Sequence, residues 1–141
     1  MAEQIFGADT TPARERRPVW RAMWHGFRGR CPHCGEGKLF RAFVKPVDHC
    51  AVCGEDYTHQ RADDFPAYIT ITIVGHIVLG GFLAVETLFI LSNWVHLAIW
   101  VPLTIIMSIA LLQPVKGAII GLQWANYMHG FGGETEEPPE Q

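Results

Sequence analysis

Four cysteines provide the clearest chemistry in the sequence. They form two pairs, Cys31 with Cys34 and Cys50 with Cys53, and fifteen residues separate the pairs. This C-x2-C-x15-C-x2-C spacing is typical of four thiolates that bind one tetrahedral zinc ion. A glycine follows each pair and allows the tight turn that brings both sulfurs to the same ion. The sequence therefore predicts one structural zinc ion per chain.

Two other interpretations of the cysteines remain open. Cys-Pro-His-Cys is also the active-site sequence of some thiol-disulfide oxidoreductases, in which the first cysteine begins a helix within a strand and helix framework. Here Gly35 interrupts that helix, and no long βαβ pattern surrounds the motif. Two structural disulfides would instead require an oxidising compartment. Zinc is the favoured interpretation, and His33 should then face solvent, because four thiolates complete the coordination.

The segments around the cysteines are short, polar and too small to bury a core without a metal. Residues 1–17 are expected to be a disordered arm, because no apolar pattern runs through them. Residues 18–28 mix aromatic side chains with arginines and predict a short helix. That helix either lies at a membrane surface or packs on the zinc module, and both interpretations stay open. Residues 29–62 are predicted to form a zinc ribbon with short β-strands.

The second half of the chain is apolar and predicts two membrane spans. The first, residues 63–91, begins with acidic residues followed by Pro66, as helices often do, and continues without Lys or Arg. The second span covers residues 95–128, with a kink near Pro114 and a cytoplasmic extension. The fold class is thus a zinc ribbon followed by an α-helical transmembrane hairpin.

The charges that flank the hairpin predict its orientation. Its connecting turn, Ser92 to Trp94, carries no charge, whereas Arg61 precedes the first span and Lys116 follows the second. Basic residues stay on the cytoplasmic side, so both termini should be cytoplasmic in a bacterial inner membrane. That compartment is reducing, which supports zinc over disulfides. The acidic end of the chain, residues 129–141, is predicted to be disordered.

Five polar residues of the spans are candidates for structural or partner-binding roles. His76 falls near the bilayer centre and is expected either to bond within the helix bundle or to contact a cofactor or partner. Glu86 is expected to reach the interface as a snorkelling carboxylate or to act in a site. Lys116 is predicted to approach Asp63 or Asp64; alternatively, the aspartates cap the helix and the lysine anchors the second span.

Several motifs together resemble a bacterial family called domain of unknown function 983. The resemblance covers about residues 18–131 and implies a small inner-membrane protein without an established activity. Genes of this family often neighbour genes for cytochrome c oxidase subunits and assembly factors. The motifs that carry it are Cys31-Pro32-His33-Cys34-Gly35, Gly37-Lys38-Leu39-Phe40, Cys50 to Cys53, His59-Gln60-Arg61-Ala62-Asp63-Asp64, Pro66-Ala67-Tyr68, Ile73-Val74-Gly75-His76-Ile77-Val78, Pro114-Val115-Lys116-Gly117 and Gly121-Leu122-Gln123-Trp124.

The leading functional prediction is a non-enzymatic, zinc-stabilised membrane protein that binds a respiratory cytochrome c oxidase or its assembly intermediate. No nucleophile and base pair, phosphate-binding loop or open metal motif supports catalysis, and no small-molecule substrate is expected. One alternative is a thiol oxidoreductase, or a copper or haem handling protein that uses His76. A membrane-tethered nucleic-acid binder rests only on nine Lys or Arg within residues 14–45, a charge that suits anionic lipid equally.

Overall fold

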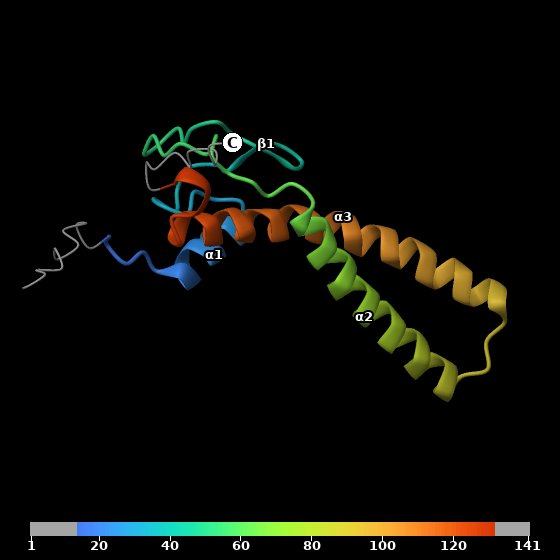
Figure 1. Ribbon diagram of the computed structural model, residues 1–141. Helices are drawn as coiled ribbons and strands as arrows, with labels where there is room; N and C mark the ends of the chain where they lie inside the picture. Colours follow the sequence, from blue (N-terminus) through green and yellow to red (C-terminus); the bar gives the residue numbers. More distant parts are fainter. Residues whose placement is uncertain (1–13, 132–141) are drawn as a thin grey trace, which may run out of the picture.

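The computed structural model describes residues 14–131. A cysteine-bearing segment with short strands precedes two long apolar helices, which confirms the predicted fold class (Figure 1). The parts of the predicted disordered ends at residues 1–13 and 132–141 lie outside the described residues. In chain order the elements are α1 (Val19–Phe27), β1 (Phe40–Ala42), β2 (Lys45–Pro46), α2 (Phe65–Leu88), α3 (Asn93–Ala125) and the 3-10 helix η1 (Met128–Gly130).

Helices α2 and α3 form an antiparallel hairpin (Figure 1). Pro66 lies in the first turn of α2, where its missing N–H costs no helical bond. Gly81 gives α3 room, because a Cβ there would lie 2.7 Å from the ring of Trp100. The connection is residues 89–92 rather than the predicted 92–94, since Phe89 turns to an extended conformation and ends α2 early.

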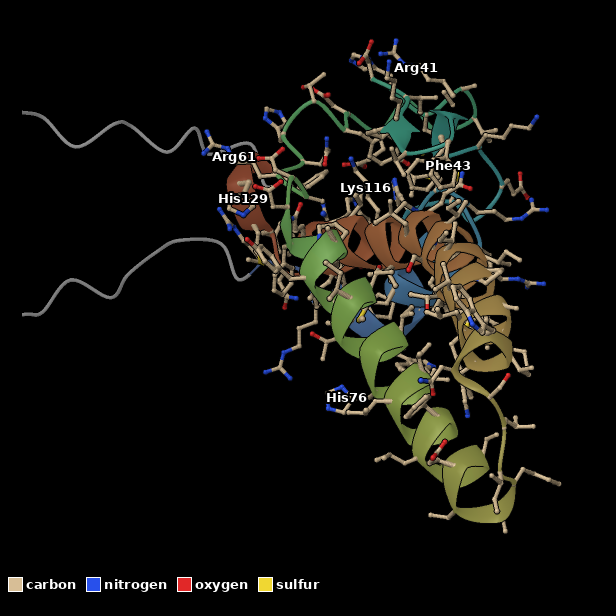
Figure 2. The ribbon with its side chains drawn as sticks, turned by 90° about the vertical axis from the view of Figure 1, so that its right-hand side faces the viewer. Arg41, Phe43, Arg61, His76, Lys116 and His129 are labelled. Carbon is tan, nitrogen blue, oxygen red and sulfur yellow. The ribbon has the colours of Figure 1, made fainter. Side chains whose placement is uncertain are left out.

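Helix α3 contacts α2 in the hairpin and also contacts α1 and the ribbon. It continues through Pro102 and Pro114, although each proline removes one backbone hydrogen bond. The helix changes direction along its length, so that its C-terminal part leaves α2 (Figures 1 and 2). In both views the C-terminal part of α3 lies between the ribbon and α1. Helix α1 is on the same side of α3 as the hairpin.

Small residues allow α1 to pack closely on α3. Gly26 lies against the backbone of Gly117, and a Cβ on either glycine would overlap the carbonyl oxygen of the other. Gly121 lies in the same way against Ala22. Each helix therefore carries two small residues four positions apart, a spacing that brings helix backbones together. Residues 19–27 thus form the predicted short helix, which packs mainly on α3 rather than on the zinc module, and its place at a membrane surface stays a prediction.

The ribbon is stabilised mainly by turns rather than by sheet. Strands β1 and β2 pair antiparallel, with Phe40 opposite Pro46, and two isolated bridges lie outside these strands, between Arg30 and Lys38 and between His49 and Asp56. Leu39 and Tyr57 are buried inside the ribbon, in one continuous core with Ile120 of α3. This apolar contact joins the ribbon to the helices.

The prediction of disorder is wrong where the ends of the described chain meet α3. The guanidinium of Arg17 donates to the carbonyl oxygen of Trp124 over 2.8 Å, and the Tyr127 hydroxyl donates to the carbonyl of Glu15 over 2.6 Å. At the other end, η1 covers residues 128–130 and Phe131 is buried. Aromatic contacts order these segments although their composition is polar.

Candidate metal centre

The four cysteines converge on one point. Their sulfurs all lie within 4.8 Å of one another, with 3.6 Å between Cys31 and Cys53 and 3.7 Å between Cys34 and Cys50. A tetrahedral site with metal to sulfur bonds of about 2.3 Å needs sulfurs about 3.8 Å apart. The sulfur positions therefore fit a single ion with four thiolate ligands.

The two cysteine pairs have the same local geometry. Gly35 and Gly54, which follow the pairs, both have left-handed φ angles, of 73° and 77°. Each glycine N–H donates to the carbonyl of the first cysteine of its pair, over 2.8 Å from Gly35 to Cys31 and 3.0 Å from Gly54 to Cys50. Glycine adopts this conformation without the steric cost of a Cβ, and the resulting turns direct both sulfurs of a pair inward.

A third glycine is needed for space rather than for conformation. Gly37 is buried, and its carbonyl accepts a hydrogen bond from the N–H of Cys31 over 2.8 Å. A Cβ at position 37 would overlap the sulfur of Cys50. Sequence reasoning assigned no role to Gly37, because the contact joins the two cysteine pairs across the ribbon.

Hydrogen bonds give the thiols different acidities. Burial raises the pKa of Cys31, although the buried Tyr57 hydroxyl donates to its sulfur. Burial would raise the pKa of Cys50 as well, but the N–H groups of Cys53 and Val52 lower it to about 6. A thiolate, not a thiol, binds the metal, and burial raises the pKa of the Cys53 thiol as well, to about 12.

The ribbon is attached to α3 next to the centre. His33 is exposed as predicted, yet its ring stacks on Trp124 with 5.4 Å between centroids. Its Nδ1 lies 3.2 Å from a carboxylate oxygen of Glu55. Further along, the side chain of Gln123 exchanges two hydrogen bonds with the backbone of Arg61. Two side chains of α3 thus hold both ends of the ribbon.

The remaining predicted site residues do not join this centre. Asp64 is the residue before α2 but makes no side-chain capping bond. Within residues 14–131, no ion pair links Lys116 to Asp63 or Asp64, so the predicted pairing is wrong for this structure. Lys116 lies on the part of α3 that is next to the ribbon (Figure 2).

His76 points away from α3 (Figure 2). Its Nδ1–H donates to the carbonyl of Thr72, one turn earlier on the same helix, over 2.7 Å. The ring is exposed, and Nε2 remains available as an acceptor. His76 therefore bonds within its own helix and does not contribute to the contact between α2 and α3.

A second polar contact lies near the hairpin turn. Nε2 of His96 lies 3.0 Å from Glu86, outside the alignment of a hydrogen bond, and Nδ1 of His96 accepts from the Trp100 indole over 3.2 Å. Phe82 packs on the same imidazole with 4.9 Å between centroids. His96 is buried. The nearly equal distances of Glu86 and His96 from the turn were the signal for this contact.

Comparison with known proteins identifies a family. The family model described as "Protein of unknown function (DUF983)" matches residues 40–124, which is more than half of the chain. The matched region runs from β1 to Trp124 and includes the second cysteine pair. Comparisons with curated proteins and with solved structures give no match.

Proposed function

The chain belongs to the DUF983 family, and from this premise we propose that it is a non-enzymatic, zinc-stabilised bacterial inner-membrane protein that binds another membrane protein. Its first candidate partner is a respiratory cytochrome c oxidase or an assembly intermediate of that enzyme. The candidate follows from the gene neighbourhood that the family resemblance implies, whereas the binding surface is argued below from the residues.

The exposed apolar surface of the hairpin supports membrane insertion. Helices α2 and α3 are long and apolar enough to cross a bilayer, and only 11% and 6% of their most apolar windows are buried. Side chains such as Ile71, Leu79 and Ile106 are more than half exposed. Water would penalise so large an apolar surface, whereas hydrocarbon would not. Both termini are proposed to be cytoplasmic, where the thiols stay reduced.

Four thiolates support zinc as the structural ion. Soft sulfur ligands in a tetrahedral arrangement suit Zn²⁺, and a site with four protein ligands has no open position for substrate. Three of the ligands are buried or half-buried, and the Leu39 and Tyr57 core packs around them. The ion would contribute folding free energy to a module with little apolar core.

The outward face of α2 is the observation that carries the proposal. His76, Thr72 and Gly80 lie on the side of the helix opposite Thr70, Val74 and Gly81, which face α3. Cβ atoms at Gly75 and Gly80 would meet no atom within 4 Å. An imidazole facing lipid near the bilayer centre is costly, and small residues allow a second helix to approach closely. A partner helix would cover His76 and bond its Nε2.

Photocrosslinking in native membranes tests this face. A photoreactive residue at Leu79 should crosslink to a specific membrane protein, and the same residue at Ile106, on α3, should not. His76→Leu should reduce that crosslink severalfold, while metal content and protein level stay unchanged. Identification of an oxidase subunit or assembly factor would support the candidate partner. Equal crosslinking from Leu79 and Ile106, or none that depends on His76, would refute the proposed binding face.

A further inference from the structure

A basic pocket lies beside the C-terminal end of α3, outside the cluster of the four cysteine sulfurs. Its volume is about 320 Å³. Three arginines line it together with aromatic and imidazole side chains, and Glu15 supplies its one carboxylate. The residues on which the argument rests are Arg16, Arg17, Arg21, His33, Trp124 and Tyr127.

The pocket is held in shape by Arg17. Its guanidinium lies 4.1 Å from the ring centroid of Trp124 and 4.0 Å from that of Tyr127, and it donates to the Trp124 carbonyl. These two ring contacts and the hydrogen bond keep the charge of Arg17 in a fixed position. A bound anion would therefore meet a prepared guanidinium rather than a flexible one.

Other hydrogen-bond donors at the pocket lack acceptors. Arg16 and Arg21 are exposed, and in the described part of the chain neither forms an ion pair. Their guanidinium N–H groups therefore remain free to bind an anion. These donors suit the oxygens of a phosphate.

An apolar cavity lies on α1, the helix that also carries Arg21 of the basic pocket. Its volume is about 220 Å³, and Trp20, Met23, Trp24 and Phe27 line it with Ala118 of α3. Trp20 is 80% exposed. This aromatic surface belongs to the layer that lies toward the hairpin (Figures 1 and 2). Tryptophan is enriched where hydrocarbon meets lipid headgroups, so acyl chains could lie along α1.

We propose that this end of the protein binds the phosphate of an anionic phospholipid, with the headgroup in the arginine pocket and the acyl chains along the aromatic surface of α1. The inference rests on the proposed membrane insertion. A lipid is favoured over RNA as the ligand because α1 contributes side chains to both the basic pocket and the apolar cavity. Free phosphate has the same oxygen chemistry but would not use the aromatic surface.

Native mass spectrometry of the full chain in detergent tests the proposal. With equal amounts of phosphatidylglycerol and phosphatidylcholine present, the chain should retain phosphatidylglycerol preferentially. Arg16→Gln with Arg21→Gln should lower that retention about 25-fold, since each basic residue near an anionic lipid contributes roughly fivefold. The matched control is Arg41→Gln with Lys45→Gln, which removes the same charge from β1 and β2 and should leave retention unchanged.

Several results would overturn the lipid site. Equal retention of the two lipids would show no preference for an anion, and equal losses in both double variants would indicate net charge alone. Displacement of the lipid by excess inorganic phosphate or by single-stranded RNA would identify a different ligand. Alkaline extraction of the membranes separates the two proposals, because release of the unmodified chain would contradict membrane insertion itself.

Discussion

The side-chain amide of Gln123, on α3, forms two hydrogen bonds with the backbone of Arg61. The N–H of Arg61 donates to Oε1 over 3.2 Å, and Nε2 donates to the carbonyl of Arg61 over 2.8 Å. Gln123 is buried, whereas Arg61 is exposed. The side-chain amide thus satisfies the backbone N–H and carbonyl of Arg61, as a neighbouring strand would, in the segment that leads from the ribbon to α2.

Gln123→Leu should release that segment. Leucine is similar in size to glutamine but cannot form the two hydrogen bonds, for a loss of about 1–3 kcal/mol. Because Arg61 is a trypsin site, cleavage after it should accelerate severalfold. Asn126→Ala is the control, since Asn126 is exposed and bonds only within its own helix. Unchanged cleavage in Gln123→Leu would mean that the two hydrogen bonds do not hold the segment.

Gly37→Ala should prevent metal binding without removing a ligand. The added methyl group would occupy the space of the Cys50 sulfur, so the four sulfurs could no longer approach to bonding distance of one ion. The bound metal per chain, measured by elemental analysis, should fall from about one to a small fraction. Glu36→Ala changes the neighbouring exposed residue and should retain the ion. Full metal content in Gly37→Ala would contradict the close approach.

Gly117→Ala should separate α1 from α3. The new Cβ would overlap the Gly26 carbonyl, and overpacking of this kind costs about 1–3 kcal/mol. The expected result is a lower midpoint of thermal unfolding and faster trypsin cleavage after Arg21. Gly80→Ala provides the control, because a Cβ there meets no atom within 4 Å. If both variants unfold alike, close backbone packing does not hold α1 in place.

A cysteine at Ser92 should report the orientation of the hairpin. Ser92 is exposed in the connection between α2 and α3, on the side of the hairpin opposite the ribbon. In intact cells, Ser92→Cys should react with a membrane-impermeant maleimide from the periplasm, and the four native cysteines should not. A C-terminal reporter should respond as cytoplasmic. Labelling only after inner-membrane lysis would invert the proposed topology.

Local patterns in the sequence predicted the metal ligands and the two long helices. Cys31 and Cys34 lie within one turn, so their spacing alone shows how two sulfurs can face one ion. Apolar composition likewise predicts a long helix without knowledge of its neighbours.

Contacts between distant segments could not be predicted in the same way. Gln123 and Arg61 carry no complementary charge, and Gly37 acquires its role only when the two cysteine pairs meet. The packing of α1 on α3 did have a signal, because Ala22 and Gly26 share the four-residue spacing of Gly117 and Gly121. The Lys116 prediction failed because it assumed an α3 that stays alongside α2.

The close packing of α1 on α3 also sets an order of events during synthesis. Gly26 is made about ninety residues before Gly117, and the N-terminal parts of a chain fold first. Residues 31–57 can enclose their ion while both apolar helices are still to be made. Helix α1 finds its partner only when α3 has returned to the side where the cysteines lie. A chain whose second helix fails to return would leave Ala22 and Gly26 uncovered, and would differ from the finished protein at its N-terminus.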